Sequence, residues 1–214
     1  MRDEPMEVEF THDIACVWSA LAYVRFQRAA EEHRAGGGEL EVVFRPYETE
    51  PSSTETPSGR GRLQPAPAAR IEQIAQAAAA DGLVVNLDRI VPAHTGEAHR
   101  LIALAAAHGN AEDMTARLYR AYFSDGLDIG DVNVLRGLAS AIGVRWDGER
   151  SHAQPARPTR ASGPRVPVFR FPDGTILVGA VSLANLRSEL MRVGSPRRRG
   201  RQSSNRLLAA ESVF

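Results

Sequence analysis

The chain of 214 residues carries 26 basic and 26 acidic side chains, so its formal net charge is zero at neutral pH. This balance provides no general attraction to nucleic acid or to an anionic membrane surface. Hydrophobic residues at 43% and charged residues at 24% are typical of a globular domain, and no apolar run approaches the ~20 residues of a membrane-spanning helix. Cys16 is the only cysteine, which excludes an intrachain disulfide and favours a reducing compartment. The acidic N-terminus lacks an apolar signal core, and the sequence predicts a cytoplasmic protein.

A short strand and an amphipathic helix meet at Cys16. Polar and apolar residues alternate over residues 7–11, as in a half-buried strand. Val17, Leu21 and Val24 then share one face of a helix. A thiol at a helix N-terminus lies beside unpaired N–H groups and the positive end of the helix dipole, so we expect a lowered pKa for Cys16. The alternative is that Cys16 is a small buried hydrophobic residue.

Further along the chain, the sequence predicts a strand, then a long helical region, then a hairpin and a last helix. The glycines at 36–38 end the first helix before an apolar strand at 40–47. The pattern predicts helices from residue 66 to about residue 144, with Thr95, Asn110 and Asp131 as candidate N-caps. Two apolar runs around Asp173-Gly174 predict a hairpin, and Ser182 is placed to cap a last helix.

The segment Cys16-Val17-Trp18-Ser19 resembles the active-site turn of DsbA-like thioredoxin-fold oxidoreductases, whose usual motif is Cys-Pro-Trp-Cys. The likeness continues in Arg25-Phe26, in the strand at 41–47, in Ala98-His99-Arg100-Leu101 and in residues 120–131. The nearest branch is FrnE-like, which is related to 2-hydroxychromene-2-carboxylate isomerases and kappa-class glutathione transferases. The resemblance covers about residues 6–193.

The resemblance implies an α/β protein, a thioredoxin fold interrupted by an all-helical subdomain. The first part of the thioredoxin fold would occupy residues 1–51 and the second part residues 163–194. The helical insertion at 66–146 lies between two polar linkers, 52–65 and 147–162. The tail at 195–214, with its run of arginines at 197–199 and at 201, has the composition of a disordered end.

The resemblance also indicates residues around the thiol. Pro167 corresponds to the cis-proline that faces the active cysteine in this fold, and Val166 before it would pair with an extended substrate through its backbone. Trp18 either shapes the entrance to the thiol or packs in the core. His99 and Arg100 either line the cleft between the two subdomains or brace them. His12 affects the thiolate only if it faces the site, and a surface position is the alternative. The histidines show no metal-ligand spacing, so neither a metal nor a bound cofactor is expected.

Ser19 stands where dithiol enzymes carry the resolving cysteine, which excludes a Cys-x-x-Cys cycle within one chain. Its hydroxyl either donates to the thiolate or bonds to its own backbone. The resemblance implies a monothiol oxidoreductase in which Cys16 attacks a disulfide and a low-molecular-weight thiol releases it. The alternatives are a thiol-dependent isomerase or transferase acting on a small aromatic substrate, and a binding protein without catalysis. Expected partners are the small thiol and a disulfide substrate, with neither nucleic acid nor membrane, and the relatives make a homodimer plausible.

Overall fold

The computed structural model describes residues 5–48, 68–146, 166–194 and 207–209. The linkers predicted at 52–65 and 147–162 lie outside the described residues. The chain divides into two compact units. Unit 1 combines Met1–Tyr47 with Ala156–Phe214, and unit 2 is Glu48–Pro155. One unit is therefore interrupted by the other in sequence, as the predicted insertion requires.

Unit 1 contains the sheet and two helices. Its strands are β1 (Met6–His12), β2 (Leu40–Pro46), β3 (Val168–Arg170), β4 (Ile176–Val178) and β5 (Leu207–Ala209), and its helices are α1 (Val17–Ala35) and α6 (Leu183–Gly194). The strand order is β2-β1-β3-β4-β5. β2 runs parallel to β1, β3 is antiparallel to both β1 and β4, and β5 runs parallel to β4.

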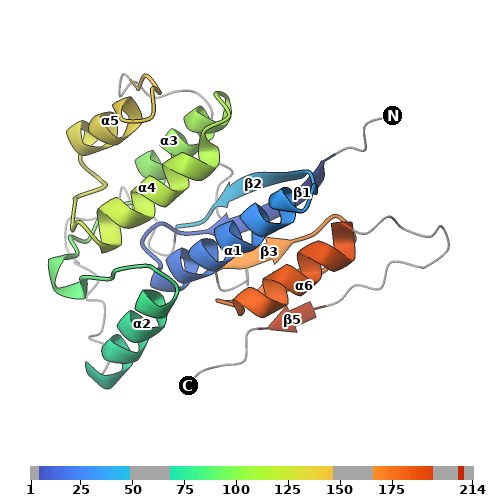
Figure 1. Cartoon of the computed structure of the whole chain (residues 1–214). Helices are drawn as coiled ribbons and strands as arrows, with labels where there is room; N and C mark the ends of the chain where they lie inside the picture. Colours follow the sequence, from blue (N-terminus) through green and yellow to red (C-terminus); the bar gives the residue numbers. More distant parts are fainter. Residues whose placement is uncertain (1–4, 49–67, 147–165, 195–206, 210–214) are drawn as a thin grey trace. The chain divides into compact units, whose positions relative to one another are not determined.

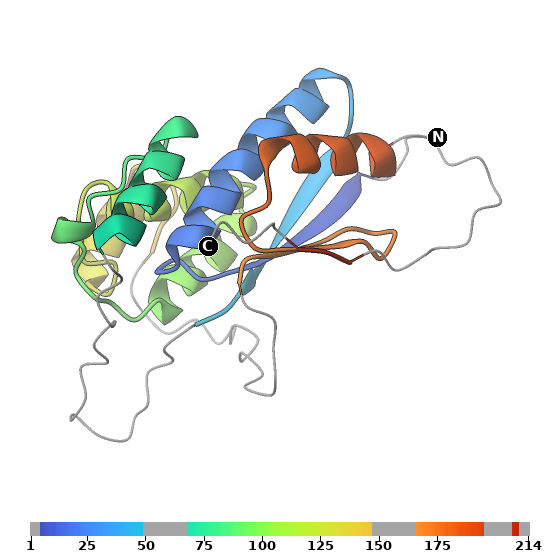
Figure 2. The ribbon, with the colours of Figure 1, turned by 90° about the horizontal axis from the view of Figure 1, so that it is seen from below.

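Helices α1 and α6 lie side by side over one face of this sheet (Figures 1 and 2). Beneath them, the ring of Phe10 stacks on Phe169 with centroids 4.5 Å apart and on Tyr23 of α1 at 5.8 Å. Phe26 of α1 also stacks on Phe169, at 4.9 Å. These aromatic side chains are buried, so the core of unit 1 lies between the sheet and the two helices.

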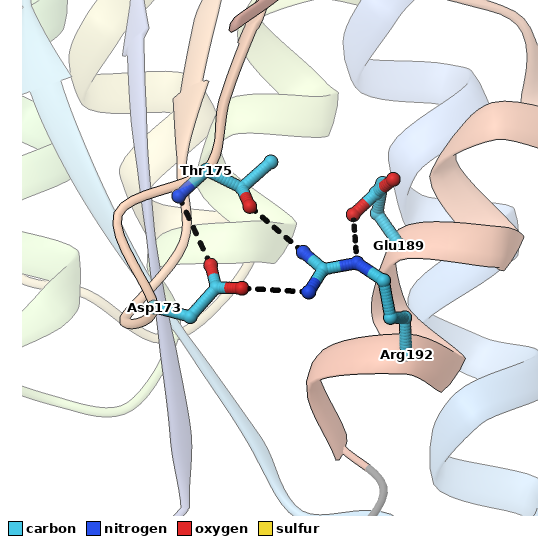
Figure 3. Close-up of polar contacts among 4 residues, drawn as sticks. All are labelled: Asp173, Thr175, Glu189 and Arg192. Carbon is cyan, nitrogen blue, oxygen red and sulfur yellow. Dashed lines mark hydrogen bonds and ion pairs between the residues drawn. The ribbon is translucent and has the colours of Figure 1, made fainter. Parts of the chain in front are cut away.

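A charged cluster joins α6 to the turn between β3 and β4 (Figure 3). The Arg192 guanidinium lies 2.7 Å from Asp173 Oδ2, 2.7 Å from Thr175 Oγ1 and 2.7 Å from Glu189 Oε2. The turn itself contains Gly174 at φ +88°, a left-handed conformation that favours glycine. The predicted hairpin is confirmed, and its tip is fixed to the last helix.

Unit 2 is helical over its described residues. It contains α2 (Ala68–Ala80), a 3-10 turn η1 (Leu87–Arg89), α3 (Gly96–Ala106), α4 (Ala111–Phe123) and α5 (Val132–Ser140). Helices α3, α4 and α5 pack against one another around the buried side chains of Leu101, Met114, Leu118, Ile129 and Leu135. Every regular element described within residues 68–146 is helical, in agreement with the predicted pattern.

The three predicted N-caps of unit 2 occupy the right positions, but only one of them caps through its side chain. Asp131 accepts a hydrogen bond from the Asn133 backbone N–H at 2.7 Å. Thr95 has a helical backbone, φ −96° and ψ −1°, and makes no side-chain cap. The Asn110 amide donates to the carbonyl of Ile142 at 3.4 Å instead of capping α4. For Thr95 and Asn110 the expected cap bond is therefore wrong.

The tail is not disordered throughout, because β5 lies within residues 195–214. Its backbone pairs with the outer side of β4, and Leu208 is in register with Leu177. The partner strand is distant in sequence, so no local pattern in the tail predicts this contact. In the described part of the chain, no helix is long and apolar enough to cross a membrane.

Candidate functional site

Cys16 lies at the junction of β1 and α1. It is the N-cap residue of α1, with an extended backbone at φ −92° and ψ 112°. A tight turn stabilises this position, since the Asp13 carbonyl accepts from the Cys16 N–H at 3.2 Å and the Asp13 carboxylate accepts from the Ala15 N–H at 3.1 Å. The placement of Cys16 at a helix N-terminus is thus confirmed.

The first turn of α1 surrounds the thiol with hydrogen-bond donors. The Ser19 hydroxyl, the Ser19 backbone N–H and the Trp18 backbone N–H all hydrogen-bond to the Cys16 sulfur. Ser19 is buried, and its Oγ also accepts from the Asp13 backbone N–H at 3.5 Å. The Ser19 hydroxyl thus has both the thiol and the Asp13 backbone N–H as partners.

Burial is the largest influence on the Cys16 thiol, and it raises its pKa. The hydrogen bonds from Ser19 oppose this effect, the negative charge of Asp13 adds to it, and the Trp18 N–H again opposes it. The net pKa is raised, so the expectation of a lowered pKa is wrong. The physical reason is that the free-energy cost of removing a thiolate from water is larger than the stabilisation that the hydrogen-bond donors at the helix N-terminus provide.

Two residues close to Cys16 in sequence differ in their surroundings. His12 is fully buried, with its ring stacked on Phe10 at 4.8 Å and edge-on to Phe44 at 5.4 Å. It is a core residue of the sheet face under α1, so the surface position considered for it is wrong. Trp18 is half-buried, and its backbone rather than its ring makes the contact with the thiol that the structure gives.

Val166 and Pro167 precede β3, and the peptide bond between them is cis. Val168, the next residue, is in register with Thr11 near the end of β1. Pro167 therefore lies at the end of the sheet from which the chain leaves β1 toward Cys16. Its carbonyl accepts from the Gly179 N–H at 2.8 Å, which ties the segment to the end of β4.

His99 and Arg100 belong to α3 of unit 2. His99 is buried, with 4% of its surface exposed. The Arg100 guanidinium pairs with the carboxylate of Glu97 one turn earlier, and its Nε is buried without a hydrogen-bond partner among the described residues. The other predicted site residues, Cys16, Trp18, Ser19, Val166 and Pro167, all belong to unit 1. The assignment of His99 and Arg100 to a substrate cleft stays a prediction.

Asp13 is the one site residue to which the sequence assigned no role. It is almost fully buried, with 2% of its surface exposed, and its charge acts on the thiol. Its signal was present in the Asp-x-x-Cys spacing, which one turn of chain brings together. Over the described residues, no group of three or more His, Cys, Asp or Glu side chains is arranged to hold a metal ion.

Taken together, these residues form a half-buried thiol with three donors aimed at its sulfur and a carboxylate close by. The donors would stabilise negative charge on sulfur once the proton has left, and they would equally bind the sulfur of an incoming thiolate or disulfide. With one cysteine in the chain, a disulfide formed here is necessarily with another molecule.

Comparison with known proteins gives results at the level of both sequence and fold. The sequence model of the DSBA-like thioredoxin domain matches residues 7–191. A probable DsbA oxidoreductase from Streptomyces coelicolor superimposes with a TM-score of 0.73 at 25% identity, covering 92% of this chain and 93% of that one. A 2-hydroxychromene-2-carboxylate isomerase gives a TM-score of 0.53 at 16% identity, covering 87% and 95%. No curated protein was found that matches the chain in sequence.

Proposed function

Because the chain belongs to the DSBA-like thioredoxin domain family, we propose that it is a thiol–disulfide oxidoreductase that works through Cys16 alone. The observation that carries the proposal is the position of this thiol at the N-cap of α1, with donors from Ser19 and Trp18 on its sulfur. Such donors stabilise the thiolate, which is the attacking species in disulfide exchange.

The proposed cycle has two exchange steps. The Cys16 thiolate attacks the mixed disulfide of a substrate with a small thiol, a new sulfur–sulfur bond forms to the small thiol, and the substrate leaves as a thiolate. A second small-thiol molecule then attacks this adduct, releases Cys16 and leaves as the symmetrical disulfide. The substrate sulfur is reduced and the sulfur of the second small-thiol molecule is oxidised, while the small-thiol sulfur of the mixed disulfide stays at the disulfide level. The electrons therefore balance without a second protein cysteine.

Deprotonation of Cys16 is part of this cycle. Since burial raises the thiol pKa, most of the protein carries a neutral thiol near neutral pH, and we expect the attack to accelerate as the pH rises toward that pKa. The Ser19 hydroxyl and the Trp18 N–H hold the charge when it appears. We assign substrate binding to the Val166 backbone and to Pro167, which directly precede β3.

His99 and Arg100 are proposed to bind the substrate from the helical unit. The buried Nε of Arg100, without a partner in the described part of the chain, is a donor available to an anionic group. Arg100→Ala should raise KM by about tenfold, whereas the alkylation rate of Cys16 should stay unchanged. Glu97→Ala, which removes the same ion pair but no donor, is the matched control.

Trapping the adduct tests the proposal. The intact chain is incubated with oxidised glutathione as the probe and analysed by mass spectrometry, before and after addition of reduced glutathione. We expect one glutathione adduct on Cys16, fully removed by the reduced thiol, and none on Cys16→Ser. A chain whose thiol alkylates but never forms the adduct would contradict the proposal.

One observation favours a second function, a thiol-dependent isomerase or transferase. A Cys16 thiol that burial keeps neutral is a hydrogen-bond donor, and with Ser19 it would hold the thiolate of a bound small thiol. In that case reduced glutathione binds saturably, the S-methyl form binds more weakly, and no adduct forms with oxidised glutathione. The presence or absence of the covalent adduct therefore separates the two functions, and a separate binding titration with reduced and S-methyl glutathione tests the second one.

A further inference from the structure

Strand β2 forms an edge of the sheet in unit 1 (Figure 1). Among the described residues, no strand pairs with its outer side, whereas the opposite edge, β4, is covered by β5. β2 spans 7 residues, against 3 in each of β3, β4 and β5. A long edge strand with open N–H and C=O groups is a template for pairing with another strand.

The hydrogen bonds to β1 show which residues of β2 present these groups. The Tyr47 N–H donates to the His12 carbonyl, and the Glu39 carbonyl accepts from the Met6 N–H. Because backbone groups alternate in direction along a strand, the odd-numbered residues bond to β1. The outward groups belong to the even-numbered residues, Leu40, Val42, Phe44 and Pro46. A proline is tolerated on this outward side, where no donor is needed.

We propose that β2 is the homodimer interface of this protein, paired antiparallel with β2 of a second copy about a two-fold axis through Val43. In this register Glu41 lies opposite the partner's Arg45. The two-fold axis generates a second, identical pair between Arg45 and the partner's Glu41. Val42 lies opposite the partner's Phe44, and Val43 meets its own counterpart. A strand whose opposite charges are equally spaced from its centre is complementary to itself, as an isologous interface requires.

The backbone bonds agree with this register. Val42 and Phe44 would exchange both of their bonds with the partner. Leu40 would donate to the partner's Pro46 but receive nothing, because proline has no N–H. The one acceptor left over is thus the Leu40 carbonyl, and it already accepts a hydrogen bond from the Arg34 guanidinium at 3.0 Å. The Leu40 carbonyl therefore needs no donor from the partner, because Arg34 of its own chain already supplies one.

The side chains agree as well. Glu41 and Arg45 belong to non-hydrogen-bonded pairs in this register, in which opposite side chains approach most closely. Glu41 is exposed and makes no ion pair among the described residues. Arg45 uses its Nε and one terminal nitrogen for Glu9 of its own chain, and its other terminal nitrogen remains for the partner's Glu41.

The resulting dimer has one continuous sheet, with α1 and α6 of both protomers on the same face. The antiparallel pairing places the two Cys16 turns at opposite ends of that sheet. The interface therefore leaves the thiol chemistry of each protomer unaffected.

Reversing the charge at Glu41 or Arg45 tests the interface. The dimerisation of each full-length variant is measured by sedimentation equilibrium. Glu41→Arg and Arg45→Glu each place like charges opposite each other twice, and each should weaken dimerisation at least about tenfold. Mixed in equal amounts, the two variants are complementary, and we expect a heterodimer. Glu39→Arg, an equal charge change outside the pairs, should dimerise like the parent, and all variants should alkylate at Cys16 at the parental rate.

Cross-linking tests the register. In a Cys16→Ser background, Val43→Cys should form a disulfide-linked dimer on oxidation, because opposite side chains in a non-hydrogen-bonded pair lie within bonding reach. Glu7→Cys, on β1, should not. The proposal is overturned by a parent chain that stays monomeric at hundreds of micromolar, by a dimer indifferent to Glu41→Arg, or by equal cross-linking at both positions.

Discussion

At the scale of single residues, the chemistry of this protein depends on opposing influences on one sulfur atom. Burial and the charge of Asp13 favour the neutral Cys16 thiol, while donors from Ser19 and Trp18 favour the thiolate. Each contribution comes from a different group, so each can be removed separately. The pKa of Cys16 is therefore the quantity by which substitutions at this site should be judged.

Replacing Ser19 by alanine should raise the Cys16 pKa further, because the hydroxyl bond to the sulfur is the largest influence that lowers it. The alkylation rate at neutral pH should fall accordingly, and its midpoint should move to higher pH. The measurement is the pH dependence of iodoacetamide alkylation followed by mass spectrometry. Ser140→Ala, on an exposed helix position of unit 2, should leave the profile unchanged.

Replacing Asp13 by asparagine should have the opposite effect. The amide oxygen can still accept from the Ala15 N–H, so the turn is kept while the negative charge beside the sulfur is lost. We expect the Cys16 pKa to fall and alkylation at neutral pH to accelerate. A slower reaction, with unchanged thermal stability, would show that Asp13 acts on the thiol other than through its charge.

The sequence was sufficient to place Cys16 at the helix N-terminus, because the strand and helix periodicities on its two sides are local. It was not sufficient for the sign of the pKa shift. That sign depends on the burial of the thiol in the folded chain and on the charge of Asp13. Helix-end electrostatics alone gave the opposite sign.

At the scale of secondary-structure elements, Arg192 joins α6 to the turn between β3 and β4. Its partners are well shielded, with 9% of the Asp173 side chain and 5% of the Glu189 side chain exposed. Burial by itself would raise the pKa of Asp173, but the Thr175 N–H and the Arg192 guanidinium hold it below its ordinary value. The cluster thus stabilises the fold through a charged carboxylate.

Arg192→Ala should lower the free energy of unfolding by about 1 to 2 kcal/mol, a value reduced from that of a fully buried pair because the Arg192 side chain is 40% exposed. Arg120→Ala is the control, because its pair with Asp125 at 3.7 Å is more exposed, and it should change the free energy by less than about 0.5 kcal/mol. Urea unfolding at neutral pH measures both. Equal effects of the two substitutions would contradict the account.

The stabilisation by this cluster should depend on pH. A carboxylate whose pKa is lowered by folding contributes fully above its ordinary pKa, about 4 for aspartate, and the contribution is lost as the pH falls through the lowered value. The difference in unfolding free energy between the parent chain and Arg192→Ala should therefore shrink on acidification. A difference that stays constant down to pH 2 would exclude the ionised Asp173 as its source.

Elements with strong local signals were predictable. The helices of unit 2 have clear periodicity, and Asp131 caps α5 as expected. The bonds predicted for Thr95 and Asn110 failed, because the backbone of one is helical and the amide of the other bonds to Ile142. β5 was missed because a strand of 3 residues shows no period and its partner β4 lies far away in sequence.

At the scale of the whole molecule, the order of the elements carries the fold. A strand, a helix and a strand precede the helical unit, and a hairpin and a helix follow it. This order was predictable, because each element has its own pattern and the resemblance supplied the way they join. The sequence also shows that the molecule lacks a second cysteine, and that single fact separates the proposed cycle from a dithiol cycle.

The central claim is that Cys16 alone exchanges disulfides with a small thiol, and steady-state turnover tests it most directly. The rate of reduction of a glutathione mixed disulfide is measured at several concentrations of substrate and of reduced glutathione, with Cys16→Ser beside the parent chain. We predict parallel double-reciprocal lines, the pattern of a covalent enzyme intermediate, and no turnover above background for Cys16→Ser. Turnover that survives in Cys16→Ser, or lines that intersect, would contradict the account.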